Sequence, residues 1–232
     1  MTAQTRFALY FTPPPGSALA RFGAGVLGYD CDTGAPVARR KLDGIDAAAA
    51  AAATADPARY GFHGTLMAPF APAPGRSVDE LEAALAAFVR GRAPVPLGRL
   101  KVAGIGAFTA LVPAGREDAV RTFAGDCVTA FDGFRAPLSA RDRARHLATR
   151  LSPRQVELLD RWGYPYVFSE FRFHMTLTGR LPAHEQARWQ AALAVAFAPL
   201  APSPVDVDAV SLVRQEDRDA PFRVIAREPL QG

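Results

Sequence analysis

What this sequence has little of narrows the kind of protein it encodes. Its 232 residues include two cysteines, Cys31 and Cys127, too few for a disulfide framework and too far apart for a metal-binding motif. No apolar run approaches the length that crosses a bilayer, and the opening MTAQTR lacks the basic and apolar regions of a secretory leader. We therefore expect a cytoplasmic protein of a reducing compartment without membrane attachment.

Lysine is equally scarce, since Lys41 and Lys101 are the only two and arginine supplies almost all of the positive charge. The formal net charge of +4 favours an anionic ligand but is too small for a protein that coats nucleic acid. Hydrophobic residues make up 49% and charged residues 22% of the chain. These values are typical of a globular protein with its own core.

Strand and helix patterns alternate along the chain, and their order occurs twice. Two apolar strands, 6–11 and 108–113, each stop at proline, and each begins a series of strand, helix, histidine-bearing strand, helix and strand. Capping residues and apolar spacing predict the helices. They are expected at 47–53, 77–88, 115–131, from 152 on and at 183–197, with further strands at 60–70, 100–111, 171–178, 205–213 and 222–227.

Two copies of one supersecondary pattern predict an α+β fold in a single domain, 1–232, with two pseudo-symmetric lobes packed face to face. The sequence repeats span approximately 1–105 and 106–232. The second copy is longer by residues 134–167, a segment rich in arginine and tyrosine. We expect this insert to form a lid or a wall of the ligand site.

One short motif appears in both copies. The first is Phe62-His63-Gly64-Thr65-Leu66 and the second is Phe173-His174-Met175-Thr176-Leu177, so that four of five residues agree. A single His-x-Thr carries little information, because histidine and threonine often serve only structure. Two copies inside matching frames are hard to obtain by chance and indicate a paired site.

Alternation along a strand assigns faces to these residues. In the second copy the apolar side chains at 171, 173, 175 and 177 form the core face, and Arg172, His174, Thr176 and Thr178 form a polar face. In the first copy alternation predicts Phe62, Leu66 and Ala68 facing inward, with His63, Thr65 and Met67 on the opposite face. Facing each other, the two polar faces would line one cleft.

The residue types suit acid–base chemistry on a phosphate ester. Cleavage of a phosphodiester needs a base for the attacking oxygen, an acid for the leaving oxygen and donors for the non-bridging oxygens. His63 and His174 titrate near neutrality, so one can be neutral while the other is protonated. The hydroxyls of Thr65 and Thr176 supply donors for the phosphate. Which histidine is the base stays open at this point.

With these residues the chain resembles the two-histidine (2H) phosphoesterase superfamily, which includes RNA 2′,3′-cyclic phosphodiesterases and 2′-5′ RNA ligase-like proteins. It is most similar to a branch found with bacterial phosphonate-utilisation (carbon–phosphorus lyase) genes. The resemblance covers nearly the whole chain. The segments that carry it are 60–70 (YGFHGTLMAPF), 131–138 (FDGFRAPL), 162–167 (WGYPYV) and 171–179 (FRFHMTLTG).

The resemblance implies two antiparallel-rich sheets flanked by helices around a central V-shaped cleft. It implies metal-free catalysis by His63 and His174, with Thr65 and Thr176 on the phosphoryl group and no cofactor. A lysine would be expected at position 67, so that Met67 would remove one phosphate contact. The implied activity is hydrolysis of a cyclic or other small phosphate diester of a sugar or nucleotide, in phosphonate metabolism, with no obligate protein partner.

Other roles compete with this interpretation. A metal site would need a third ligand, and near the histidines only Glu170 is close in sequence. Processing of short RNA ends, by opening a cyclic phosphate or by 2′-5′ ligation, is a rival activity, and a nucleotide-binding protein without turnover is a rival class. Candidate substrate contacts are Arg172, on the histidine face, and Tyr164 and Tyr166, whose rings can stack on a base or sugar.

Overall fold

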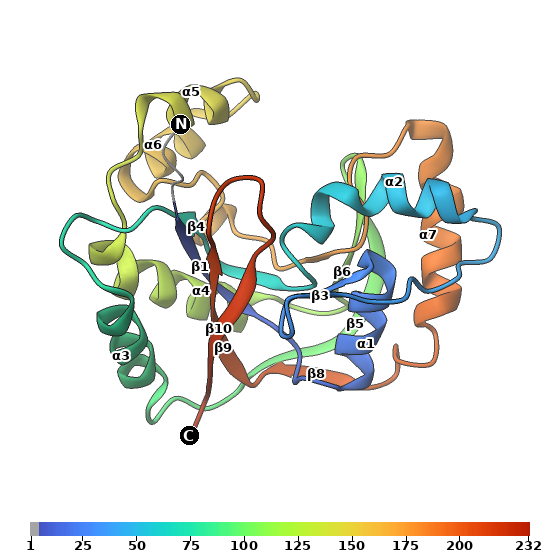
Figure 1. Ribbon diagram of the computed structural model, residues 1–232, viewed down its shortest axis with the longest axis horizontal. Coiled ribbons are helices and arrows are strands. Elements are labelled where there is room, and N and C mark those ends of the chain that lie inside the picture. The colour runs from blue at the N-terminus through green and yellow to red at the C-terminus, as the bar shows by residue number, and fades with distance from the viewer. Residues whose placement is uncertain (1–4) are drawn as a thin grey trace.

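The structure is a computed structural model that describes residues 5–232. Residues 1–4, on which part of the expectation about a leader rests, lie outside the described residues. Within the described chain, none of the helices has both the length and the apolar composition for a membrane crossing. The predicted α+β class is confirmed, with one large sheet and helices packed around it (Figure 1).

Eight strands form one antiparallel sheet in the order β10-β9-β1-β4-β7-β6-β5-β8, and β2 and β3 form a small second sheet. The two antiparallel-rich sheets that the resemblance implies are one eight-stranded sheet and one of two strands, because β4 pairs directly with β7 at Gly64 and Met175 and joins the two halves. The strands are β1 Arg6–Phe11, β2 Tyr29–Asp30, β3 Ala35–Pro36, β4 Gly64–Phe70, β5 Val95–Ile105, β6 Phe108–Pro113, β7 Met175–Thr176, β8 Pro204–Val207, β9 Ala209–Gln215 and β10 Arg223–Pro229.

The repeated order of elements is confirmed, since β1, α2, β4, α3 and β5 are followed by β6, α4, β7, α7 and β8. The halves of the sheet nevertheless exchange strands. β5, from the first repeat, pairs with β6 and β8, whereas β9, from the second, pairs with β1. The sequence division into 1–105 and 106–232 therefore does not divide the sheet, because each half draws strands from both repeats.

Seven helices accompany the strands in the described residues: α1 Ala18–Leu27, α2 Ala47–Ala58, α3 Val78–Val89, α4 Asp118–Phe131, α5 Ala140–Leu147, α6 Pro153–Trp162 and α7 Ala183–Phe197. The capping box expected at Ser77 and the serine cap expected at Ser152 are both present, and Gln155 completes a capping box at Ser152 as well. Helix α1 was not predicted, although Ser17 caps it and Gly28 ends it in the left-handed region.

Helix α2 continues past its predicted end and includes Pro57 in its last turn. Proline has no backbone N–H, so the carbonyl of Ala53 loses its helical partner. That carbonyl instead accepts a hydrogen bond of 2.6 Å from the backbone N–H of Gly179. The proline therefore makes possible a link between α2 and the chain that follows β7.

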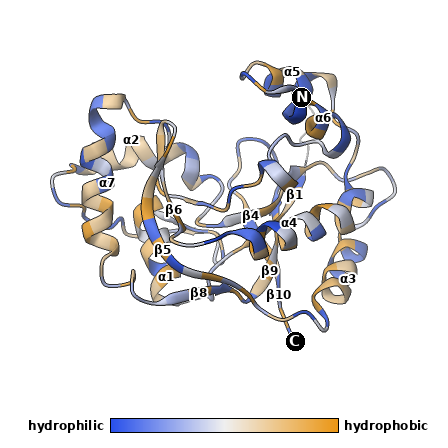
Figure 2. Ribbon diagram, turned by 180° about the vertical axis from the view of Figure 1, so that it is seen from behind, coloured by the Kyte–Doolittle hydropathy of each residue, from blue (hydrophilic) through white to orange (hydrophobic). Residues whose placement is uncertain are grey.

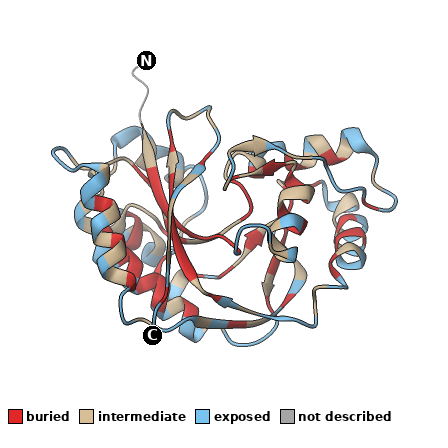
Figure 3. Ribbon diagram, turned by 60° about the horizontal axis from the view of Figure 1, so that its bottom comes forward, coloured by how far each residue is buried: buried red, intermediate tan, exposed pale blue. Residues whose placement is uncertain are grey.

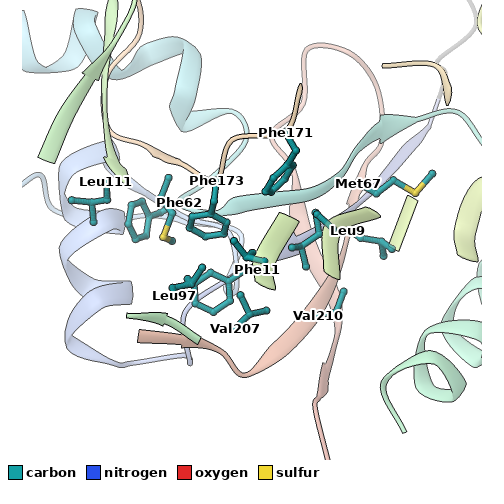
Figure 4. Packing of buried hydrophobic residues seen from close by; sticks show 14 of the residues in the cluster. Leu9, Phe11, Phe62, Met67, Leu97, Leu111, Phe171, Phe173, Val207 and Val210 are labelled. Atoms are coloured by element: carbon teal, nitrogen blue, oxygen red, sulfur yellow. The ribbon is translucent and has the colours of Figure 1, made fainter. Parts of the chain in front are cut away.

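The main core lies between one face of the sheet and helices α3, α4 and α7, which pack on the strands (Figures 2 and 3). The predicted core face of the second motif is confirmed, since Phe171, Phe173, Met175 and Leu177 are all buried. The ring of Phe173 lies near Phe11, with the ring centroids 6.2 Å apart (Figure 4). The two histidine motifs are thus anchored in one apolar layer.

Strand β7 is much shorter than the predicted strand 171–178, because the chain before Met175 does not join the sheet. The backbone N–H of Phe173 instead donates to a carboxylate oxygen of Glu117, at 2.9 Å, just before helix α4. A side chain thus replaces a strand partner and fixes the segment that carries His174.

The predicted faces of the first motif hold from Phe62 to Leu66 but fail at Met67 and Ala68. The pairing of β1 with β4 passes from Tyr10–Thr65 to Leu9–Met67, so one residue on β1 is matched by two on β4. This bulge turns Met67 into the core, where it is 4% exposed, and leaves Ala68 facing the cavity described below. Met67 is therefore not a missing phosphate contact.

Gly64 separates His63 from Thr65, and a Cβ atom there would lie 2.5 Å from the ring of Phe173. We predict that Gly64→Ala lowers the free energy of unfolding by about 1–3 kcal/mol, because the ring must move within a packed core. Gly115→Ala is the control, since nothing lies within 4 Å of its added Cβ. Equal urea-denaturation midpoints for both variants and the wild type would contradict this account.

Candidate functional site

A cavity of about 680 Å³ opens on the face of the sheet opposite the main core. One wall comes from the end of α2 and from residues 179–180, and the other comes from residues 135–146 and 163–164. In Figures 1 and 2 these elements stand on either side of the central strands. The insert 134–167, predicted to form a wall of the ligand site, thus supplies one wall of this cavity. The volume is that of a pocket for a small organic ligand.

The two His-x-Thr motifs meet at the floor of this cavity. The antiparallel pair of Gly64 and Met175 brings His63 and Thr65, on either side of Gly64, close to His174 and Thr176, on either side of Met175. His63, Thr65 and Thr176 line the cavity, and His174 lies beside it, with its ring centroid 5.6 Å from that of the cavity residue Phe108.

Both histidines are held in the same way. His63 Nδ1 donates to the carbonyl of Gly61 and His174 Nδ1 donates to the carbonyl of Arg172, each at 2.9 Å and each two residues earlier. Since a carbonyl only accepts, both rings carry their proton on Nδ1 and present Nε2 as an acceptor. Gly61 adopts φ +72°, and a Cβ there would lie 2.5 Å from Cys31, so this position favours glycine.

The two imidazoles differ in their surroundings. The ring of His63 stacks on Tyr10, with centroids 3.7 Å apart and planes inclined by 17°. Burial lowers the pKa of His63 to about 4, the hydrogen bond to Gly61 opposes this shift and the charge of His174 adds to it. His63 is therefore neutral near pH 7, and the Thr65 hydroxyl, 3.1 Å from Nε2, donates to it.

Tyr10 also contributes an unusual polar group. Its side chain is fully buried, and its hydroxyl has no hydrogen-bond partner among residues 5–232 although it borders the cavity. Burial holds the pKa of this phenol well above its usual range, so that it stays protonated. Sequence reasoning missed this group, because Tyr10 lies within an apolar run, between Leu9 and Phe11, that was predicted to be a buried strand.

The candidate substrate contacts divide into two groups. Tyr164 lines the cavity, whereas Arg172 and Tyr166 are exposed and do not belong to its lining. Arg172 contributes its carbonyl to His174, and the ring of Tyr166 packs edge-on against that of Tyr164 at 5.6 Å. Thr178, placed on the polar face, lines the cavity but binds the backbone of Thr109 and Gly179.

Six arginines line the cavity against three aspartates, and sequence reasoning identified none of them. The arginines are Arg6, Arg59, Arg135, Arg145, Arg180 and Arg218, and the aspartates are Asp56, Asp142 and Asp219. Alternation on the first strand was the one available signal, because it places Arg6 on the same face as Tyr10. The others come from loops and from the insert, whose meeting in space no local pattern predicts.

Within the described residues, no three histidine, cysteine, aspartate or glutamate side chains group closely enough to hold a metal ion. Glu170, the carboxylate nearest to His174 in sequence, accepts a hydrogen bond of 2.7 Å from Gln155. The polar groups around the histidines are instead arginines and hydroxyls, which suit an anionic ligand.

Two curated proteins align with almost all of this chain. Both are named Ribose 1,5-bisphosphate phosphokinase PhnN. The protein from Janthinobacterium sp. (strain Marseille) is 37% identical over 239 residues, covering 99% of this chain and 52% of that protein. The protein from Laribacter hongkongensis (strain HLHK9) is 37% identical over 219 residues, covering 94% and 50%. The chain thus spans about half the length of these relatives.

Among solved structures, TT0787 of Thermus thermophilus aligns with 98% of both chains, at 17% sequence identity and a TM-score of 0.45. A family described as "Protein of unknown function (DUF1045)" matches residues 65–223. That range begins at Thr65 and includes the whole second motif, the insert and most of the strands. The chain belongs to this family.

Proposed function

We propose that the protein is a metal-independent phosphodiesterase that hydrolyses a cyclic or other small phosphate diester of a sugar or nucleotide. The observation that carries the proposal is the pairing of β4 with β7, which brings the two His-x-Thr motifs together beside an arginine-lined cavity. Two imidazoles and two hydroxyls around one point are the groups that in-line displacement at phosphorus requires.

His63 is the general base in this proposal. Its pKa of about 4 keeps it neutral at pH 7, and the proton on Nδ1 leaves Nε2 free to take a proton from the attacking water. The water oxygen bonds to phosphorus as the bond from phosphorus to the leaving sugar oxygen breaks. His174, in its protonated form, gives its Nε2 proton to that oxygen, and the products are a phosphomonoester and a free hydroxyl.

The threonines stabilise the charge that develops on phosphorus. The Thr65 hydroxyl, which donates to His63 in the free protein, turns to a non-bridging oxygen once substrate is bound. The Thr176 hydroxyl lies across the strand pair and donates from the other side. Hydroxyl donors fixed by a sheet reach the phosphoryl group without adding a further titratable side chain.

A ribose phosphate is the substrate class that we favour. The resemblance to the phosphonate-associated branch of the two-histidine superfamily supports it, and so does the naming of the two relatives for an enzyme of ribose 1,5-bisphosphate. The phosphorylation in that name is not assigned to this chain. Neither Lys41 nor Lys101 follows a glycine, whereas the phosphate-binding loop of such kinases ends in glycine and lysine.

Removal of either imidazole tests the proposal. We predict that His63→Ala and His174→Ala each lower kcat for adenosine 2′,3′-cyclic phosphate by about a hundredfold to ten-thousandfold. His184→Ala is the control, because His184 is exposed on α7 and does not line the cavity. Wild-type activity should persist in excess EDTA. Turnover that needs added zinc or manganese, or that survives in either variant, would refute the mechanism.

A substrate with a different leaving group distinguishes the general acid from the general base. A nitrophenolate departs without a proton, so an enzyme without its general acid should cleave a nitrophenyl phosphodiester of a nucleoside almost normally. We predict a loss of less than about tenfold for His174→Ala on this substrate and a loss of at least about a hundredfold for His63→Ala. The reverse order would exchange the two roles, and equal losses would exclude this division of labour.

The depressed pKa of His63 also predicts how stability depends on pH. A histidine that is neutral when folded but has an ordinary pKa near 6.5 when unfolded destabilises the protein as pH falls from about 6.5 to about 4. We expect this loss to be on the order of 2 kcal/mol, since the ring keeps partial access to the cavity. His63→Asn should lose this part of the pH dependence in thermal unfolding, whereas His184→Asn should keep it.

A further inference from the structure

Beyond the histidines, the cavity extends along strand β1 toward a group of arginines. Arg6 and Tyr10 both line the cavity, and Tyr10 stacks on His63. Four residues of strand separate their Cα atoms by about 13 Å. The guanidinium of Arg6 therefore faces the same space as His63 but at a distance that a second group of the same small molecule can span.

Four arginines from separate segments make up this group, which we call the arginine cluster: Arg6 on β1, Arg59 after α2, Arg145 on α5 and Arg218 in the loop between β9 and β10. Arg218 donates to both carboxylate oxygens of Asp142, at 2.8 and 2.9 Å, and Arg145 contacts the same carboxylate at 3.0 Å. Arg59 donates to the carbonyl of Arg218. These contacts draw the cluster together.

Positive charge in the cluster exceeds what its carboxylate neutralises. The carboxylate of Asp142 forms ion pairs with both Arg145 and Arg218. Within the part of the chain that the structure describes, Arg6 has no carboxylate partner of this kind and donates from Nε to the neutral amide oxygen of Gln215, over 2.8 Å. The two other aspartates of the lining, Asp56 and Asp219, are exposed. The pKa of Arg6 is lowered, mainly by burial and further by the charges of Arg218 and Arg145. Like charges held this close need a counter-ion.

One hydrogen-bond donor of the cluster has no partner within the described residues, and the orientation of another of its guanidinium groups is fixed by its neighbours. The Nε atom of Arg59 is buried and has no hydrogen-bond partner among residues 5–232. The guanidinium of Arg6 lies over the ring of Phe222, 5.4 Å from its centroid, in addition to its bond with Gln215. Preorganised guanidinium groups bind a phosphate through pairs of parallel hydrogen bonds and lose little entropy in doing so.

We infer that the arginine cluster binds a second phosphate of the substrate, a terminal phosphomonoester, while the two His-x-Thr motifs act on the diester. The inference rests on the proposed function, since it names the substrate class of that site: a small cyclic phosphate that carries another phosphate. A terminal monoester bears more charge than an internucleotide diester and so matches the surplus better. The ion pairs of Asp142 with Arg218 and Arg145 lie in the lining of the cavity, beside the site assigned to this phosphate.

Three matched substrates test this inference: adenosine 2′,3′-cyclic phosphate, the same compound with a 5′-phosphate, and a dinucleotide that ends in the cyclic phosphate. We expect kcat/KM to rise roughly tenfold to a hundredfold when the terminal 5′-phosphate is present, as charge-assisted hydrogen bonds predict. The dinucleotide, whose second phosphate is a diester, should gain less. Equal kcat/KM for all three, or an equal gain for the dinucleotide, would overturn the inference and leave the proposed hydrolysis standing.

Two variants assign the effect to the cluster. Arg6→Gln and Arg145→Gln should each lower the gain from the 5′-phosphate by about tenfold and change kcat/KM for the unphosphorylated compound far less. Arg145 is on the exposed helix α5, with 56% of its side chain accessible, so its replacement leaves the core intact. Arg154→Gln, which removes an exposed partner of Glu157 on α6, is the control. An unchanged gain in both cluster variants would overturn the inference.

Binding separates this inference from the proposed function. If the wild type turns over none of the three compounds, calorimetric titration with adenosine 2′,5′-bisphosphate and adenosine 2′-monophosphate decides the matter. Tighter binding of the bisphosphate that is lost in Arg6→Gln and Arg145→Gln would support the second phosphate site while the hydrolysis fails. Equal affinity for the two ligands would overturn the second phosphate site as well.

Discussion

The pairing of β4 with β7 at Gly64 and Met175 is the contact on which the rest of the site depends. It joins two halves of a sheet that would otherwise end at these strands, and it brings the two His-x-Thr motifs side by side. A shift of one residue would turn the polar side chains into the core. Glycine at position 64 lets the ring of Phe173 pack directly against strand β4, because that ring occupies the space where a Cβ would lie.

Much of this arrangement was predictable, because it follows from periodicity and repetition. The doubled order of elements, the capped helices and the polar face of His174 and Thr176 all come from local patterns that the fold keeps. Prediction failed where a contact between segments distant in sequence, and not the local residue pattern, determines the backbone. The bulge that buries Met67 depends on the partner strand, and the short β7 depends on Glu117, which lies 56 residues from Phe173.

The two histidines make equivalent hydrogen bonds to the backbone, but their rings have different neighbours. Both rings donate from Nδ1 to the carbonyl two residues earlier, so both leave Nε2 as the nitrogen that the backbone does not engage. Burial then distinguishes them, since Tyr10 covers one face of His63 whereas His174 lies nearer the edge of the cavity beside Phe108. A duplicated motif can in this way place two imidazoles with the same backbone contact in different surroundings, and burial lowers the pKa of His63.

The residues that we assign to the reaction and those that we assign to substrate binding come from different parts of the chain. The groups that we propose to act at phosphorus lie on two neighbouring strands or directly before them, where a repeated sequence reveals them. The arginines that we assign to substrate come from β1, the end of α2, the insert and the β9–β10 loop, segments that approach one another only in the folded chain. Changes in the insert and in the loop can therefore alter which phosphate ester is bound without displacing the imidazoles, because sheet pairing and the hydrogen bond from Phe173 to Glu117 hold the two motifs in place.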